Sequence, residues 1–190
     1  MNNGKALIFS APSGSGKTTI VKHLIEKYPQ LAFSISATTR QPRAGVETDK
    51  IDYHFLSGED FQKKIDQDEL VEWEEVYEGT YYGTLKSEIT RIWNQNQIVL
   101  FDVDVKGGLN LKKYFGDQAL AIFIKAPDID TLKKRLRSRK TESESDLRTR
   151  LDKIEEELTY EDKFDLVIIN DDLESSLLEA ERITKEFVNR

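Results

Sequence analysis

The sequence predicts an α/β fold in which a parallel β-sheet is covered by helices on both faces. Short apolar runs, each suited to a buried strand, alternate with segments whose apolar residues recur every three or four positions. A glycine-rich turn joins the first apolar run to the first helical segment. Because parallel strands need a crossover between them, strands separated by helices favour a parallel sheet.

The expected strands are apolar runs of four or five residues, as in a sheet that is buried on both faces. They cover residues 6–9, 31–35, 98–101, 120–124 and 166–169. The expected helices cover residues 18–28, 86–95, 105–114, 128–139, 146–159 and 172–188. The last of these has a stripe of apolar residues at three- and four-residue steps, so we expect one face of it to pack on the core.

The stretch from 37 to about 84 interrupts this alternation. It has β-prone pieces at 53–56, 70–76 and 80–82 and one short helix near 58–68, whose start is marked by Ser57 and Asp60 in a capping-box pattern. We expect a small, mainly antiparallel lobe inserted into a single domain, 1–190, with its core at about 1–36 and 85–190. Residues 139–146 are polar and are flanked by helices, which predicts a mobile lid at about 139–147.

The composition excludes several classes of protein. The net charge of −7 argues against a general nucleic-acid-binding protein, and no run of about 18 apolar residues is present for a membrane span. The chain has no cysteine, which excludes disulfides and thiolate chemistry. The first residues do not have the layout of a signal peptide, so we expect a cytoplasmic protein.

The run from Ser10 to Thr19 is the strongest local motif. Gly14 and Gly16 allow successive backbone N–H groups to curl around an anion, and the following helix begins where negative charge is favoured. Lys17 adds a positive charge and Thr18 a hydroxyl suited to Mg²⁺. The run differs from G-x-x-x-x-G-K-[ST] only at its first position, which is Ala11. It predicts a phosphate-binding P-loop and a sheet of the P-loop NTPase type.

A second set of phosphate ligands follows in the inserted stretch. Arg40 and Arg43 are three residues apart, and Tyr53 lies beyond them. Guanidinium groups match phosphate geometry, and a phenolic hydroxyl can donate to the same group. Two facing phosphate sites would indicate a phosphotransferase and not a simple NTPase.

At this point the chain resembles the guanylate kinase family along essentially its whole length. The matching motifs are S-A-P-S-G-S-G-K-T-T at 10–19, T-T-R-x-x-R at 38–43, D-Y-H-F at 52–55, V-E-W at 71–73, Y-Y-G-T at 81–84, D-V-D-V-K-G at 102–107, the arginine-rich stretch at 135–150 and I-N-D-D-L at 169–173. The resemblance implies phosphorylation of GMP, and of dGMP, to the diphosphate with ATP as donor, in a monomer or homodimer that takes part in purine nucleotide metabolism.

The resemblance also implies a role for individual residues. ATP would be bound by Ala11, Pro12, Ser13, Gly14, Ser15, Gly16, Lys17, Thr18, Thr19 and Asn170. GMP would be bound by Ser36, Arg40, Arg43, Tyr53 and Tyr82 and, at the guanine, by Glu72, Thr84 and Asp104. The residues implied to be catalytic are Lys17, Arg135, Arg139 and Arg150. Thr18 would bind Mg²⁺ directly, and Asp102 would contact it through water.

Some positions differ from the family pattern, and two other readings stay open. Compared with the family pattern, the segment 44–51 and the turn 76–79 are each one residue longer, and Lys50 and Lys140 stand where glycine is usual. One alternative is a catalytically inactive scaffold domain of guanylate kinase type that binds peptides. The other is a P-loop kinase for a different phosphorylated acceptor. The intact Gly16-Lys17-Thr18 disfavours the first, and Glu72, Thr84 and Asp104 disfavour the second.

Overall fold

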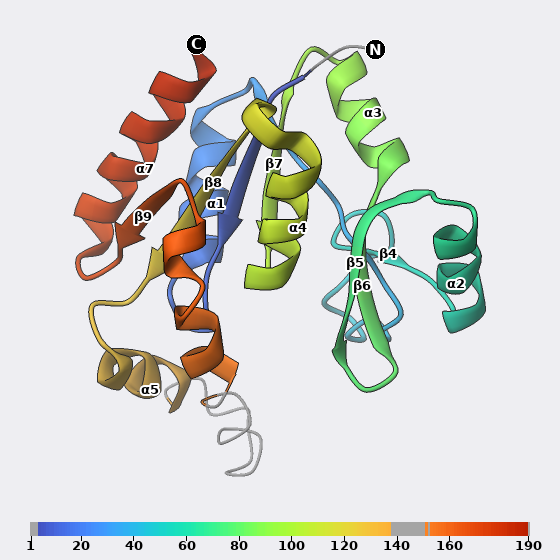
Figure 1. Cartoon of the computed structure of the whole chain (residues 1–190), viewed down its shortest axis with the longest axis horizontal. Helices are drawn as coiled ribbons and strands as arrows, with labels where there is room; N and C mark the ends of the chain where they lie inside the picture. The colour runs from blue at the N-terminus through green and yellow to red at the C-terminus, as the bar shows by residue number, and fades with distance from the viewer. Residues whose placement is uncertain (1–3, 138–150, 152, 190) are drawn as a thin grey trace.

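Two β-sheets organise the chain (Figure 1). The computed structural model describes residues 4–137, 151 and 153–189, with Tyr77 described for its backbone alone. A five-stranded parallel sheet forms the core, in the order β2 (Leu31–Phe33), β7 (Ile98–Val103), β1 (Ala6–Ser10), β8 (Ala119–Lys125) and β9 (Leu166–Ile169). The P-loop NTPase-like parallel sheet predicted from the alternation of strands and helices is therefore confirmed.

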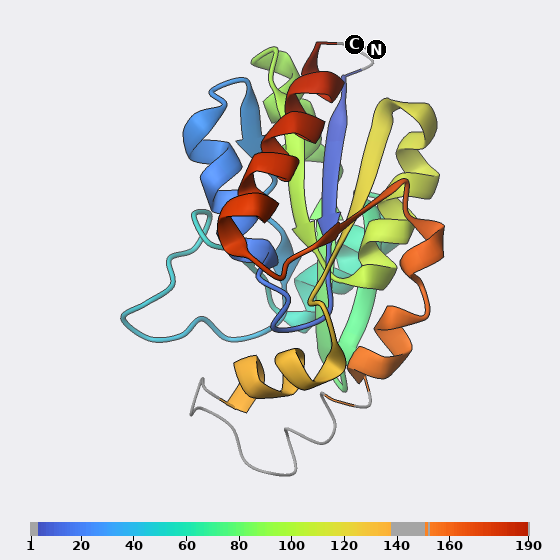
Figure 2. The ribbon, with the colours of Figure 1, turned by 90° about the vertical axis from the view of Figure 1, so that its left-hand side faces the viewer.

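Helices cover the core sheet on both faces because its central strands are apolar on both sides. α1 (Lys17–Lys27) and α7 (Leu173–Val188) pack on one face through Leu24 and Ile183, among others. α3 (Lys86–Asn94) and α4 (Val105–Phe115) pack on the other face through Ile92 and Leu111. The view turned by 90° shows the sheet between the two helical layers, with α1 on one side of it and α4 on the other (Figure 2). The apolar stripe predicted for the last helix faces the core through Ala180, Ile183 and Phe187. Leu173, at the start of the helix, is 44% exposed and does not.

The strand at 166–169 was predicted to be buried, but most of its side chains are exposed. β9 is the outermost strand of the sheet and has a neighbour, β8, on one side only. Ile168 is buried against α7, whereas Leu166 and Val167 are each 38% exposed and Ile169 is 55% exposed. An apolar run identifies a strand, but it does not tell whether that strand lies at the centre or the edge.

The inserted lobe has its own small sheet, in the order β4 (His54–Phe55), β3 (Ala37–Thr38), β6 (Thr80–Leu85) and β5 (Leu70–Tyr77). The pairs β3–β6 and β5–β6 are antiparallel and β3–β4 is parallel, so the lobe is mainly antiparallel as predicted. α2 (Gly58–Asp66) packs on it through Phe61. The Ser57 hydroxyl accepts the N–H of Asp60 at 3.0 Å, which confirms the predicted cap.

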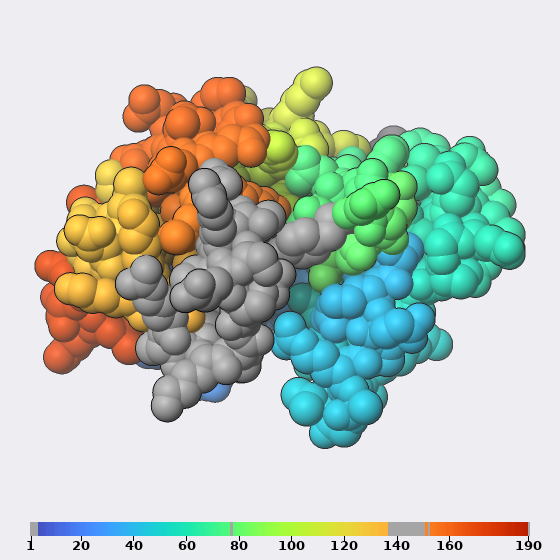
Figure 3. Space-filling view, turned by 90° about the horizontal axis from the view of Figure 1, so that it is seen from below, coloured from blue at the N-terminus to red at the C-terminus, as the bar shows by residue number. Residues whose placement is uncertain are grey.

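The lobe lies at one side of the core and α5 (Ile129–Arg137) at the other (Figure 3). The expected helix 146–159 is helical at 153–158, the part of it that is continuously described. The predicted lid, 139–147, lies outside the described residues, as do Arg139 and Arg150. None of the helices in the described part is both long and apolar enough to span a membrane.

Candidate active site

The loop between β1 and α1 has the backbone of an anion-binding turn. Gly14 and Gly16 have φ values of 89° and 91°, in the left-handed region that favours glycine. Gly16 is the N-cap of α1 and supplies no side chain to the free N–H groups, and the first turn of the helix contains no acidic residue. The N–H groups at the N-terminus of α1 are therefore available to an anionic ligand, and the dipole of the helix favours negative charge there.

Asn170 supports this loop from the far end of the chain. Its side-chain amide is 4% exposed, and Nδ2 donates to the Ser15 carbonyl at 2.7 Å. A Cβ on Gly16 would overlap Nδ2, so glycine is required here for space as well as for φ. The Arg135 Nη2 donates to the Asn170 carbonyl at 3.1 Å. The sequence resemblance assigned Asn170 to ATP, whereas the contact visible here is with the backbone of the P-loop.

Lys17 and Thr18 face the end of β7. The Lys17 ammonium is 2.6 Å from Asp102 Oδ1 and also donates to the Val103 carbonyl. The Thr18 hydroxyl donates to Asp102 Oδ2 at 3.1 Å. These contacts gather two charges of opposite sign and one hydroxyl at the mouth of the P-loop. A nucleotide phosphate at the loop would offer Lys17 a second anionic partner.

The oxygen atoms of Thr18 and Asp102 are of the kind that Mg²⁺ prefers. Among the described residues, no group of three or more His, Cys, Asp or Glu side chains could hold a metal ion by itself. Mg²⁺ is commonly bound by one or two protein oxygens, with the remaining positions filled by waters and substrate phosphates. The residues at this position therefore fit Mg²⁺ that arrives with a nucleotide.

On the lobe side, Arg40 lies behind two tyrosines. Its Nε donates to the Tyr82 hydroxyl at 3.1 Å, and its guanidinium carbon is 5.3 Å from the centre of the Tyr53 ring. The two tyrosine rings meet edge to face, with centroids 6.0 Å apart. Tyr53, Tyr82 and Ser36 line the same cavity as the P-loop. The resemblance implied that Ser36, Arg40 and Tyr53 bind the GMP phosphate and that Tyr82 also binds GMP, and the fold brings these residues together.

The register of β5 and β6 builds the next part of the site. Glu72 lies opposite Thr84, and the Thr84 hydroxyl donates to Glu72 Oε1 at 2.7 Å. Asp104 is the N-cap of α4, where its Oδ1 accepts the Gly107 N–H at 2.7 Å. A Cβ on Gly107 would lie 3.2 Å from Asp104 Oδ1 and 3.3 Å from Glu72 Oε2. Two carboxylates therefore converge over the backbone of Gly107.

Burial raises the pKa of Glu72 to about 7, and the nearby negative charge of Asp104 acts in the same direction. Two further carboxyl groups that the motifs did not single out line the same cavity. Burial raises the pKa of Glu74 to about 7, with Asp104 again contributing, and burial raises that of Glu157 to about 7. Glu74 could have been found from sequence, since residues i and i+2 of a strand share a face.

The P-loop and the lobe side chains line one continuous cavity of about 410 Å³. Its lining includes residues 11–19, Ser36, Tyr53, Glu72, Tyr82, Asp102 and Asp104. Lys153, Ile154 and Glu157, from the segment after the predicted lid, close another side. Arg43 is not among the residues that line the cavity, and its side chain is 74% exposed. Arg40 and Thr84 stand behind the residues that line the cavity. Arg40 contacts the lining residue Tyr82, and Thr84 contacts the lining residue Glu72.

Comparison with known proteins gives the same assignment as the motifs. The family model described as guanylate kinase matches residues 3–186. The chain belongs to the guanylate kinase family. The relatives named guanylate kinase include one from Bacteroides thetaiotaomicron, 48% identical over 98% of this chain and 91% of the relative. Another, from Salinibacter ruber, is 44% identical and is matched over 100% of both chains.

The fold agrees with this membership. The crystal structure of guanylate kinase from Anaplasma phagocytophilum has a TM-score of 0.76 with 26% sequence identity, and the match covers 96% of this chain and 85% of that one. The family resemblance inferred from the motifs is thus confirmed. The two apparent insertions, in 44–51 and 76–79, leave the cavity and the facing positions of Glu72 and Thr84 in place.

Proposed function

We propose that this guanylate kinase family member transfers the γ-phosphoryl group of ATP to GMP in the cavity between the P-loop and the lobe. The observation that supports this most directly is a single cavity with a P-loop on one wall and, on the other, two tyrosines backed by Arg40. A donor phosphate and an acceptor phosphate can then face each other without either nucleotide leaving its own site.

The two ends of the cavity differ in the groups they recognise. ATP phosphates bind the N–H groups of residues 13–18 at the N-terminus of α1, with Lys17 as the cation. The GMP phosphate binds Ser36, Tyr53 and Tyr82 with the support of Arg40 and Arg43. Guanine lies toward Glu72, Thr84 and Asp104. The carboxylates of Glu72 and Asp104 accept hydrogen bonds from its N1–H and 2-amino group.

The enzyme accelerates transfer mainly by positioning and by neutralising charge. The attacking oxygen belongs to the GMP phosphate and is already anionic near pH 7, so no general base is needed. Lys17 holds the donor phosphates in line with that oxygen, and Arg135 stands next to the P-loop through Asn170. Thr18 and Asp102 would hold Mg²⁺, which would neutralise charge on the phosphates when bound. Arg139 and Arg150, both outside the described residues, are proposed to add cations to the transferring group.

The hydrogen bond from Thr84 to Glu72 limits what the Thr84 hydroxyl can offer to guanine. Its proton is directed at Glu72, so in this state the hydroxyl offers a lone pair to the base and not a proton. Donation from Thr84 to guanine O6 requires the hydroxyl to turn away from Glu72. Ionised Glu72 would then accept hydrogen bonds from N1–H and the 2-amino group in place of the one from Thr84.

An assay of ADP release with ATP and a panel of nucleoside monophosphates tests the proposed function. We expect rapid turnover with GMP, turnover also with dGMP, and almost none with AMP, CMP or UMP. Omission of Mg²⁺ should abolish turnover with GMP. Equal rates with and without added monophosphate would identify an ATPase and contradict the proposal.

Arg43→Met is expected to raise the KM for GMP by about 10- to 100-fold, since a charge-assisted hydrogen bond to phosphate contributes about 1.5–3 kcal/mol. Arg43 is exposed in this structure, so its contact would form only when GMP binds. Lys50→Met removes one positive charge from the same loop and serves as the control. A raised KM for ATP with normal saturation by GMP would mean that the two phosphate sites are exchanged.

The pH dependence of kcat/KM for GMP should report the titration of Glu72. GMP needs this carboxyl ionised, and its pKa is raised to about 7, so kcat/KM should fall as the pH drops below about 7. Glu74 and Glu157 also titrate near 7 in this cavity, beside Asp104, Lys17 and Lys153. The profile of Glu72→Gln isolates the contribution of Glu72. Identical profiles for the two proteins would assign the transition to another group.

A further inference from the structure

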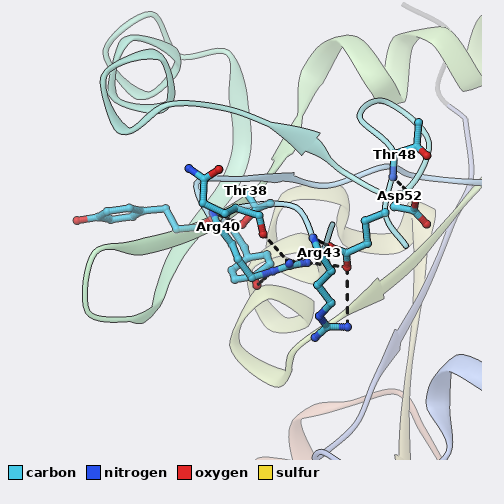
Figure 4. Close-up of polar contacts among 9 residues, drawn as sticks. Thr38, Arg40, Arg43, Thr48 and Asp52 are labelled. Carbon is cyan, nitrogen blue, oxygen red and sulfur yellow. Dashed lines mark hydrogen bonds and ion pairs between the residues drawn. The ribbon is translucent and has the colours of Figure 1, made fainter. Parts of the chain in front are cut away.

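Arg40 is held on nearly every side by partners from its own loop and from β6 (Figure 4). Its Nη1 donates to Glu47 Oε2 and to the Gln41 carbonyl, both at 2.9 Å, and its Nη2 donates to Glu47 Oε1 at 2.9 Å. Nε donates to Tyr82, and the backbone N–H of Arg40 donates to the buried Thr38 hydroxyl at 3.2 Å. Four of the five guanidinium N–H groups thus have a partner within the described part of the chain.

Glu47 is a built part of this arrangement and not a chance surface contact. Its side chain is 10% exposed, and Oε2 also accepts the backbone N–H of Arg43 at 2.8 Å. The two parallel bonds to Arg40 give a bidentate pair, which fixes the plane of the guanidinium as well as its distance. The pairing with Arg40 lowers the pKa of Glu47 to about 2, so the carboxylate is ionised under any assay condition.

The loop that carries Glu47 is itself tied down. The N–H groups of Val46 and Glu47 both donate to the Arg43 carbonyl at 3.1 Å. The Thr48 N–H donates to Asp52 Oδ2 at 2.7 Å, and the Lys50 N–H donates to the Tyr53 carbonyl at 2.7 Å. The loop therefore holds Glu47 against Arg40 and is joined to Tyr53, the residue just before β4.

The contact between Arg40 and Tyr82 also bears on what Tyr82 can offer to the cavity. Because the Tyr82 hydroxyl accepts from Arg40 Nε, its own proton is free to be donated elsewhere, and Tyr82 lines the cavity. The Tyr53 ring, also in that lining, rests on the guanidinium of Arg40. A shift of Arg40 would disturb both tyrosines at once.

We propose that Glu47 is a positioning residue for the phosphate of GMP, acting by fixing Arg40 in the plane that orients Tyr53 and Tyr82. This inference rests on the proposed function, since the anion it serves is the acceptor phosphate. Glu47 does not touch that phosphate. The alternative is that Glu47 competes with the phosphate of GMP for Arg40. GMP would then have to displace the carboxylate, and removal of Glu47 would raise the affinity for GMP.

The test is Glu47→Gln, which is nearly isosteric but turns an amide N–H₂ toward an arginine donor. We expect the KM and the Kd for GMP to rise about tenfold, while kcat at saturation and the KM for ATP stay within about twofold. Glu69→Gln, which breaks the Lys64–Glu69 ion pair of the same lobe, is the control and should leave all four values unchanged. Glu47→Asp keeps the charge and should recover part of the loss.

A double-mutant cycle separates positioning from a structural role. If Glu47 acts through Arg40, then Glu47→Gln should have no further effect on the KM for GMP in an Arg40→Met background. Additive losses, an unchanged KM in the single variant, or a lower KM from relief of competition would each overturn the inference. A wild-type protein that neither binds nor phosphorylates GMP would instead overturn the proposed function, and this inference with it.

Discussion

GMP is expected to be phosphorylated with a kcat/KM at least ~10⁴-fold higher than that of AMP. Guanine presents two donors, N1–H and the 2-amino group, to the side of the pocket where Glu72 and Asp104 meet over Gly107. Adenine has a lone pair at N1 and lacks the 2-amino group. AMP would therefore leave a buried carboxylate facing a lone pair, and sites built to hydrogen-bond a group reject analogues that lack it.

Glu72→Gln should remove most of this preference through a loss of kcat/KM for GMP. The glutamine amide can accept only through its oxygen, and its N–H₂ would oppose a donor of guanine or the Thr84 hydroxyl. Comparison of kcat/KM for GMP and AMP in both proteins measures the effect, and the KM for ATP should not change. Glu75→Gln changes a neighbouring residue of β5 that accepts the Gly79 N–H, and serves as the control.

Similar efficiencies with GMP and AMP in the wild-type protein would overturn the assignment of the guanine pocket. A loss of ATP affinity in Glu72→Gln would show that the substitution had disturbed the cavity as a whole. Glu74 lies two residues along the same strand and lines the same cavity, so Glu74→Gln completes the series. We expect that variant to retain the preference for GMP.

Lys17→Met is expected to lower kcat by at least ~10²-fold while leaving the fold intact. Lys17 is the cation nearest the N-terminus of α1 and is paired with Asp102 across the mouth of the P-loop. When phosphates bind, its ammonium can move from Asp102 to the donor, where it offsets the charge that shifts during transfer. The residual rate should come from positioning by the backbone N–H groups.

Single-turnover and steady-state rates with ATP and GMP measure the effect of Lys17→Met. Lys22→Met, an exposed residue of the same helix, is the matched control and should behave like the wild type. Thermal unfolding checks that the variant is folded. Turnover close to the wild-type rate in a folded Lys17→Met protein would contradict the role of the P-loop in the reaction.

Features that depend on neighbouring residues could be predicted from the sequence. Gly14 and Gly16 marked the turn because their φ values near 90° strain residues that have a Cβ, and Ser57 marked a helix start because its hydroxyl reaches the Asp60 N–H. The alternation of apolar runs with helical periodicity predicted the parallel sheet and its two helical layers. Each of these signals is local, so it can be read from a few consecutive positions.

Contacts between residues far apart in the chain could not be predicted from the sequence and became visible in the folded structure. The register of β5 and β6 places Thr84 opposite Glu72, and the packing of the chain brings Asn170 to the Ser15 carbonyl from 155 positions away. The loop 44–52 folds Glu47 onto Arg40, although nothing in its local pattern distinguishes it from a solvated acid. The edge position of β9 was decided in the same way. These contacts follow from strand register and packing, which involve residues far apart in the chain and leave no periodicity in its sequence.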